Sequence, residues 1–140
     1  MTIKEIQNEI IEDFSIFDDW MEKYEYLIDL AKSLPELDEK YRNKSNLIKG
    51  CQSMVWLNAD LKNGKINFQA DSNAIIVKGI VSLLIKVFSD QKPKDILKSE
   101  LFFIKEIGLL QNLSPTRSNG LTAVIKKIRL YALAFDSLSI

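Results

Sequence analysis

The feature that most constrains the fold is a long apolar segment in the middle of the chain, AIIVKGIVSLLIKVF, at residues 74–88. It is short for a helix that crosses a bilayer, and it contains Lys78 and Lys86. A helix that is apolar around most of its surface has to be buried among other elements. The segment therefore predicts a buried helix over about 74–88, with Ser72 or Asn73 as its N-cap.

The N-terminal part of the chain predicts two amphipathic helices that can cover this buried one. Isoleucines at helical spacing follow the capping-box pattern TIKE and predict a helix over about 3–13. A second helix is predicted to start at Ser15. It ends near Leu34, because Pro35 disfavours helical geometry in the residue before it.

The C-terminal part predicts three further helices. A short one begins at Pro93, and another lies in ELFFIKEIGLL and stops at Gly108. A final amphipathic helix runs from about Leu121 to Phe135. The segment QNLSPTRSNG, residues 111–120, is rich in turn-forming residues and is predicted as a loop that ends with Asn-Gly at the entry of the final helix.

A β-hairpin is predicted before the buried helix. The pair Asn-Gly at 63–64 lies between two stretches in which apolar and polar residues alternate, and both residues tolerate positive φ. The predicted strands cover about 54–61 and 65–71, and a short strand at 46–49 can join the same sheet. The fold class is thus α+β, a single domain over residues 1–140 with a small antiparallel sheet covered by helices.

Composition excludes several partners and locations. The 140 residues are 46% hydrophobic and 27% charged, which is typical of one soluble globular domain. Lys plus Arg and Asp plus Glu both number 19, so no net charge favours nucleic acid or an anionic membrane. The first residues, MTIKEIQNEIIEDF, contain no apolar signal core, and we expect a cytoplasmic protein.

The chain has one cysteine, Cys51, and no histidine. A zinc or iron–sulfur site needs several thiolate or imidazole ligands, so no metal site made by this chain alone is expected. Catalysis by Ser-His-Asp or Cys-His groups is excluded because the general base is missing. The chemistry left to the chain is that of a single thiol.

The thiol lies in a polar turn, KGCQSMVW, beside Gly50 and followed by Gln52 and Ser53. A free cysteine is commonly an inert, buried apolar residue, whereas this position favours an accessible one, and composition supports both interpretations equally. A nearby cation such as Lys49 or Arg117 would lower the thiol pKa.

Four segments, in this order along the chain, are typical of one family: DDWMEKYEYLIDLAKSLPEL, IKGCQSMVWL, DSNAIIVKGIVSLL and LSPTRSNGLTAVIKKIR. Over nearly its whole length the chain resembles the SufE family, the sulfur acceptors of the SUF iron–sulfur assembly system. The second segment matches the family's reactive-cysteine turn, and the fourth matches its Ser-Pro-x-Arg loop and last helix. The resemblance implies a SufE/IscU-like fold.

The resemblance also implies a function and a set of partners. Cys51 would carry a persulfide whose sulfur comes from a SufS-like cysteine desulfurase, and the chain would deliver that sulfur to a SufBCD-type scaffold. The desulfurase carries pyridoxal phosphate (PLP), so no cofactor is expected on this chain, which would act as a cosubstrate and activator of that enzyme. The sequence does not decide whether the protein forms a homodimer. It also leaves three alternative functions open: a SufE paralogue (CsdE-like) that serves another desulfurase or acceptor, a single-cysteine thiol redox protein, and a structural adaptor.

Specific roles are expected for several residues around the thiol. Gln52 and Ser53 would shape the turn through hydrogen bonds to backbone amides, and Asp71 would cap the buried helix or touch the desulfurase. Arg117 would favour the thiolate, bind a carboxylate of the partner or stabilise its own loop. Asn112 stands where many relatives have histidine. The thiol is expected to rest in a shallow apolar dent from which Gly50 lets the turn swing outward.

Overall fold

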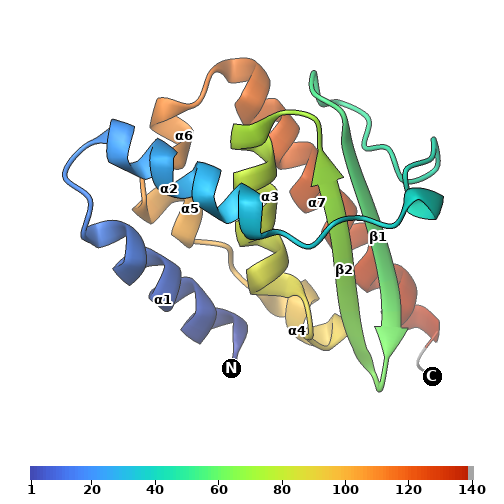
Figure 1. Cartoon of the computed structure of the whole chain (residues 1–140). Coiled ribbons are helices and arrows are strands. Elements are labelled where there is room, and N and C mark those ends of the chain that lie inside the picture. The colour runs from blue at the N-terminus through green and yellow to red at the C-terminus, as the bar shows by residue number, and fades with distance from the viewer. Residues whose placement is uncertain (139–140) are drawn as a thin grey trace.

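The computed structural model of the chain describes residues 1–138 and shows the predicted α+β architecture. Its elements in chain order are α1 (Ile3–Ser15), α2 (Trp20–Ser33), the 3-10 helix η1 (Glu39–Tyr41), β1 (Val55–Lys62), β2 (Lys65–Ser72), α3 (Ile75–Phe88), α4 (Pro93–Lys98), α5 (Phe103–Glu106), α6 (Leu109–Asn112) and α7 (Pro115–Leu138). Figure 1 shows α3 in the middle, with α1 and α2 on one side and the sheet on the other, and α7 behind the sheet.

Helix α3 is the buried helix that the apolar segment predicts. Its core-facing side chains are at most 4% exposed: Ile80, Val81, Leu83, Leu84, Val87 and Phe88. Gly79 lies where α3 crosses α2, and a Cβ added there would be 2.3 Å from the carbonyl oxygen of Leu27. Only glycine lets the two helices approach this closely. Burial of these apolar side chains is the main source of stability for the fold.

The N-cap predicted for α3 is wrong. The cap position is Ala74, and no side chain makes a capping hydrogen bond there. The hydroxyl of Ser72 accepts a hydrogen bond of 3.2 Å from the N–H of Ala74, and the side-chain oxygen of Asn73 accepts one of 3.1 Å from the N–H of Met54. Asn73 therefore holds the segment before β1 and leaves the helix uncapped.

The predicted hairpin is confirmed. β1 and β2 pair antiparallel from Val55 with Ser72 to Lys62 with Lys65. The turn residues both have positive φ, 52° at Asn63 and 79° at Gly64, which suits the twist of the strands. One face of the hairpin is buried in the common core with residues of α3 and α7; its side chains are Val55, Leu57, Ile66, Phe68 and Ala70.

The short strand predicted at 46–49 is reduced to a single bridge, between Leu47 and Trp56. Two backbone hydrogen bonds flank it, from Ile48 N–H to the Val55 carbonyl at 2.8 Å and from the Leu57 N–H to the Asn46 carbonyl at 2.9 Å. The pairing ends there because the chain turns away from β1 before Cys51, at Gly50, whose φ is 94°.

The second helix starts at Trp20, and the prediction of a start at Ser15 is wrong. The hydroxyl of Ser15 donates a hydrogen bond of 2.6 Å to the carbonyl of Glu12 and thereby closes α1. The side chain of Asp19 accepts a 2.9 Å hydrogen bond from the N–H of Glu22 and caps α2. A carboxylate at the N-cap satisfies backbone donors that have no partner within the helix.

Helix α7 starts at Pro115 and α6 includes Gln111 and Asn112, so the predicted loop at 111–120 is confirmed only at Leu113 and Ser114. The hydroxyl of Ser114 accepts a hydrogen bond of 3.3 Å from the N–H of Arg117, as an N-cap residue does. Gly120 therefore lies inside α7 and does not mark its beginning.

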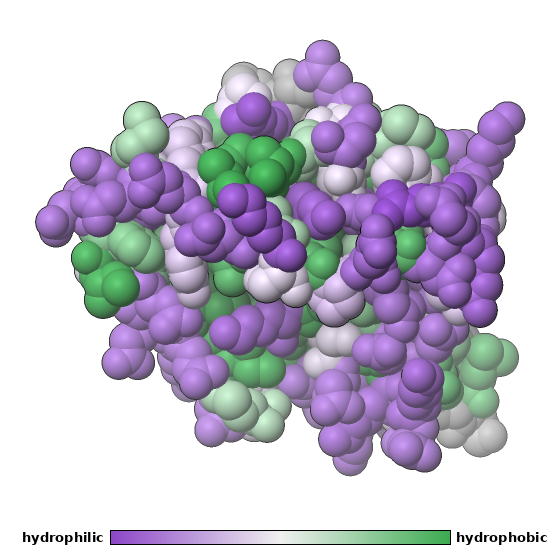
Figure 2. Space-filling view, viewed as in Figure 1, coloured by the Kyte–Doolittle hydropathy of each residue, from purple (hydrophilic) through white to green (hydrophobic). Residues whose placement is uncertain are grey.

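Polar side chains cover most of the face shown in Figure 2, and apolar side chains form separate patches on it. In the part of the chain that the structure describes, no helix combines the length and the apolar composition needed to span a bilayer. Two hollows on the surface are lined in part by the turn that contains Cys51.

Candidate functional site

The Cys51 turn, residues 49–54, joins the Leu47 bridge to β1. Its far end is fixed: the Ser72 hydroxyl donates a hydrogen bond of 2.8 Å to the carbonyl of Met54, and Asn73 binds the N–H of that residue. Its near end is Gly50, which adopts a left-handed backbone conformation that side-chain-bearing residues rarely take. The turn is thus anchored at Met54 and begins at a glycine whose backbone conformation other residues rarely adopt.

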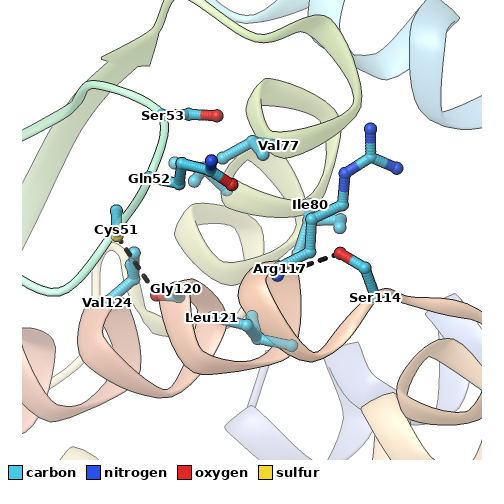
Figure 3. Close-up of a pocket in the computed structure, with 11 residues that line it drawn as sticks. Cys51, Gln52, Ser53, Val77, Ile80, Ser114, Arg117, Gly120, Leu121 and Val124 are labelled. Atoms are coloured by element: carbon cyan, nitrogen blue, oxygen red, sulfur yellow. Dashed lines mark hydrogen bonds between the residues drawn. The ribbon is translucent and has the colours of Figure 1, made fainter.

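Cys51 is half-buried and lies against α7. Its Sγ donates a hydrogen bond of 3.4 Å to the carbonyl oxygen of Gly120, as Figure 3 shows. A Cβ added at Gly120 would lie 3.4 Å from the same sulfur. That distance is an ordinary van der Waals contact, so the turn packs directly on α7 at this point.

The thiol borders a cavity of about 280 Å³ between the turn, α3 and α7. The walls are mostly apolar and come from Val77, Ile80 and Val81 of α3 and from Leu121 and Val124 of α7. Gln52 and Ser53 complete its rim on the side of the turn (Figure 3). The expected resting position of the thiol, a shallow apolar dent, agrees with this geometry.

Burial raises the pKa of the Cys51 thiol above its ordinary value, because the thiolate loses hydration in this half-buried position. Desolvation is the cause found for this shift, and neither Arg117 nor Lys49 contributes to it. Figure 3 shows the Arg117 guanidinium on the cavity rim, pointing away from the sulfur. The expected stabilisation of the thiolate by a cation is therefore not found in this conformation.

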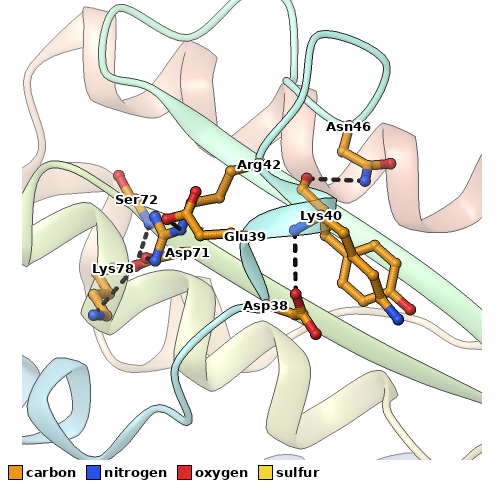
Figure 4. Close-up of polar contacts among 9 residues, drawn as sticks. Asp38, Glu39, Lys40, Arg42, Asn46, Asp71, Ser72 and Lys78 are labelled. Atoms are coloured by element: carbon orange, nitrogen blue, oxygen red, sulfur yellow. Dashed lines mark hydrogen bonds and ion pairs between the residues drawn. The ribbon is translucent and has the colours of Figure 1, made fainter.

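Asp71 does not cap α3, so that prediction is wrong. It is buried, 5% exposed, and its carboxylate pairs with Arg42 and, at 3.2 Å, with Lys78, as Figure 4 shows. Burial alone would raise the pKa of Asp71, but hydrogen bonds from Ser72, Lys78 and Arg42 hold it below its usual value. Arg42 also stacks on the Trp56 ring, 5.5 Å from its centre.

This Asp71 cluster joins three elements. Arg42 follows η1, Asp71 lies on β2, and Lys78 lies in the first turn of α3, whose next residues line the Cys51 cavity. The carboxylate therefore supports the cavity from outside, and its low exposure argues against the alternative role of contacting a desulfurase directly.

Sequence reasoning missed the two residues that fix the turn, Ser72 and Asn73, because it used them as caps for α3. A signal was present, since Ser and Asn commonly bind backbone groups in turns. Asn112 lies at the end of α6, where its side chain donates a 3.0 Å hydrogen bond to the Gly108 carbonyl and its own carbonyl accepts one from the Tyr24 hydroxyl. It is not among the residues that line the cavity.

Within residues 1–138, no group of three or more Cys, Asp and Glu side chains lies close enough together to hold a metal ion. What the site offers is one free thiol at the edge of a mostly apolar cavity. That arrangement suits exchange of a sulfur atom between thiols, which needs a thiolate, a sulfur electrophile and a leaving thiolate.

Comparison with known proteins identifies the family. The model described as "SufE: Fe-S metabolism associated domain" matches residues 8–132. The chain belongs to the SufE family. SufE proteins act in sulfur transfer for iron–sulfur metabolism and are associated in general with cysteine desulfurases.

Two relatives and one solved structure support this assignment. An uncharacterised SufE-like protein of Rhizobium etli is 42% identical over 127 residues, 87% of this chain and 86% of the relative. One of Rhizobium meliloti is 36% identical over 127 residues, 87% of this chain and 91% of the relative. The solution structure of a hypothetical protein from Thermus thermophilus has a TM-score of 0.77 and 19% identity, covering 94% of this chain and 96% of that one, and it shows the shared fold.

Proposed function

We propose that Cys51 takes sulfur from the persulfide of a SufS-type, PLP-dependent cysteine desulfurase, and that the chain stimulates that enzyme and passes the sulfur to a SufBCD-type scaffold. Membership of the SufE family supports the general role. The observation that carries the proposal is the position of the only thiol, on a hinged turn at the edge of an apolar cavity. The chain acts as a cosubstrate and needs no cofactor of its own.

The chemical step is an exchange at sulfur. The Cys51 thiolate attacks the outer sulfur of the desulfurase persulfide and forms a new S–S bond. The S–S bond in the desulfurase breaks at the same time, and its electron pair leaves on the cysteine of that enzyme as a thiolate. One sulfur atom moves, no net oxidation takes place, and the proton lost from Cys51 is taken up by the departing thiolate through solvent.

The cavity gives the product a sheltered position. A persulfide extends the side chain by one S–S bond of about 2.05 Å, and a cavity of about 280 Å³ has room for the added atom. Its walls of valine, isoleucine and leucine keep water and polar oxidants away from the reactive sulfur. The same walls disfavour the thiolate, so the resting thiol is a poor nucleophile.

Docking of the desulfurase removes this restraint. A turn hinged at Gly50 and anchored at Met54 can carry Cys51 out of the cavity without unfolding β1. Outside, the thiol recovers hydration, its pKa falls toward the ordinary value and the thiolate fraction increases. Exposure and activation thus occur in one movement.

Intact-mass spectrometry tests the acceptor role. The protein is incubated with a SufS-type desulfurase and L-cysteine without reductant. We expect the mass to increase by one sulfur atom, to return to its starting value on addition of a reductant, and to stay constant in Cys51→Ser, which keeps the size of the side chain. A sulfur atom retained by Cys51→Ser would contradict the proposal. Addition of oxygen on treatment with peroxide, without sulfur uptake, would favour a thiol redox protein.

A further inference from the structure

A second hollow lies on the other side of the Cys51 turn, between the segment 44–49 and α7. It has a volume of about 470 Å³. Lysines surround an apolar floor, and no acidic residue lines the groove. The lysines are Lys44, Lys49, Lys126 and Lys127. The floor consists of Leu47, Ile48, Ala123 and Leu130. We call this hollow the lysine groove.

The lysine groove concentrates positive charge in a chain whose net charge is zero. The ion pairs found within residues 1–138 belong to Arg42 and Lys78, and none of them involves a lysine of the groove. Lys127 lies over the ring of Tyr131, 5.2 Å from its centre, and the other three lysines are exposed. Like charges within a Debye length of about 8–10 Å repel one another, so an anionic occupant stabilises this arrangement.

The groove is continuous with the sulfur-transfer site. Ala123, on its floor, is the residue nearest to Gly50: a Cβ added at Gly50 would lie 3.5 Å from that of Ala123. Gly120, whose carbonyl binds the Cys51 thiol, is three residues earlier on α7. Lys49 belongs both to the groove and to the turn. A chain segment lying in the groove therefore touches the hinge that carries the thiol.

An apolar strip extends the groove along α7. A shallower hollow shares Lys126 and Leu130 with it and continues over Ile125 to Leu133. Leu130 and Leu133 are 50% and 56% exposed, which is high for leucines that adjoin one another on a helix. The occupant that matches this surface has carboxylates for the lysines and apolar side chains for the leucines.

We infer that the lysine groove binds an acidic, amphipathic segment of the cysteine desulfurase that donates sulfur to Cys51. The inference rests on the proposed function, because it names the partner surface for the same thiol. A protein segment suits the groove better than a membrane does, since the lysines line both walls of a concave site and do not form one flat face. We name the donor because it is the partner that has to reach the free thiol, and the groove adjoins the turn that carries this thiol.

The test measures L-cysteine turnover by a SufS-type desulfurase, with reductant present, against the concentration of this protein. Lys44→Glu/Lys126→Glu reverses two exposed groove lysines, and Lys4→Glu/Lys94→Glu is the control with the same change in net charge on exposed lysines outside the groove. We expect the groove variant to raise the half-saturating concentration about tenfold and to change kcat less than about twofold, because charge complementarity acts mainly on association.

Two further measurements, the dependence on salt and the loading of Cys51 by polysulfide, distinguish weaker docking from a less reactive thiol. Raising NaCl from about 50 to about 500 mM increases the half-saturating concentration of the wild type and of the control, and it does so much less for the groove variant. Inorganic polysulfide, which needs no docking, loads Cys51 equally in all three proteins. Equal loading by polysulfide together with the same half-saturating concentration in the groove variant and the control would overturn the groove while leaving the acceptor role intact.

Two other occupants have distinct signatures. Loss of binding to phosphatidylglycerol vesicles in the groove variant, with its half-saturating concentration unchanged, would assign the groove to a lipid surface. Loss of a wild-type dimer in sedimentation equilibrium, again without a change in half-saturation, would assign it to a second copy of the chain. Either result overturns the inference, and so does failure of the wild type to accept sulfur from the desulfurase, which removes the proposed function as well.

Discussion

The burial of Cys51 affects both the protection of a bound sulfur atom and the reactivity of the free thiol. In the resting conformation the apolar walls raise the thiol pKa and reduce the thiolate fraction at neutral pH. Thiol exchange is fastest when the pKa of the attacking thiol is near the ambient pH, so the resting protein is held away from that optimum. This restraint limits the reaction of the resting thiol with electrophiles.

Alkylation measures this effect directly, because Cys51 is the only thiol. We expect the rate of reaction with iodoacetamide, followed against pH, to give an apparent pKa above the ordinary value of about 8.5 in the native protein, and a value near 8.5 in denaturant. Arg117→Ala should leave the native value unchanged, since the guanidinium points away from the sulfur. A native pKa below 8.5 that rises in Arg117→Ala would show that the arginine stabilises the thiolate after all.

At the scale of elements, local patterns predicted most of the fold. The hairpin followed from an Asn-Gly pair between alternating stretches, and α3 followed from one apolar segment, because both signals are contained in a few neighbouring residues. The start of α7 was missed although Ser114 and Pro115 form an N-cap and first-turn pattern. The Asn-Gly pair at 119–120 predicts a helix entry, whereas Gly120 lies inside α7 and its carbonyl accepts the hydrogen bond from Cys51.

The parts of the site that escaped prediction depend on contacts between distant segments. Nothing near Asp71 in the sequence indicates that Arg42 reaches it, since that contact exists only once the segment between α2 and η1 has crossed the hairpin (Figure 1). The environment of Cys51 is of the same kind, because its cavity walls come from α3 and α7, which lie far from the turn along the chain. The thiol was predictable, and its raised pKa was not.

The Asp71 cluster provides a test of element packing. Asp71→Asn keeps the side-chain volume but leaves Lys78 without its counter-charge and Arg42 with only the exposed Glu39. We therefore expect a loss of about 2–3 kcal/mol in the free energy of unfolding at pH 7, measured in urea. Asp29→Asn, an exposed aspartate on α2, should change it by less than about 0.5 kcal/mol. Equal effects of the two substitutions would mean that the cluster does not stabilise the fold.

The pH dependence of the same variant has a defined sign. The pKa of Asp71 is lower in the folded than in the unfolded chain, so its contribution is complete above the unfolded value of about 3.9 and is lost as the pH falls through the folded value. The wild type should therefore lose stability below about pH 4 more steeply than Asp71→Asn does, and the difference between the two should shrink. A difference that stays constant down to about pH 2 would assign the effect to packing alone.

At the scale of the whole molecule, one helix connects the functions of the site. α7 packs across the hairpin, where the rings of Phe68 and Tyr131 lie 6.5 Å apart, and its first half forms one wall of the Cys51 cavity. The same helix contributes part of the floor and one wall of the lysine groove. A partner that docks along α7 would thus contact both an element of the core and the Cys51 turn, as the proposed function requires.

Hydrogen exchange tests whether docking moves the turn. Residues 49–53 include the proposed hinge, Gly50, and end before the hydrogen-bonded N–H of Met54. We therefore expect their amide exchange to become faster when a SufS-type desulfurase is added. β1 should keep its protection, because its ladder with β2 is not part of the movement. Unchanged exchange at 49–53 in the complex would leave the thiol inside its cavity and remove the transfer mechanism.

A glycine substitution separates the hinge from a general loss of stability. Gly50→Ala causes no steric clash, since the added Cβ would lie 3.5 Å from that of Ala123. The left-handed φ of 94° nevertheless strains the substituted residue by about 1 kcal/mol. Gly50→Ala should therefore speed exchange at 49–53 even without the desulfurase, because the strain is relieved when the turn leaves the cavity. Gly64→Ala imposes a similar strain at φ 79° in the hairpin turn and should leave exchange at 49–53 unchanged. The same acceleration in both variants would show that the turn opens with the fold as a whole and not at its own hinge.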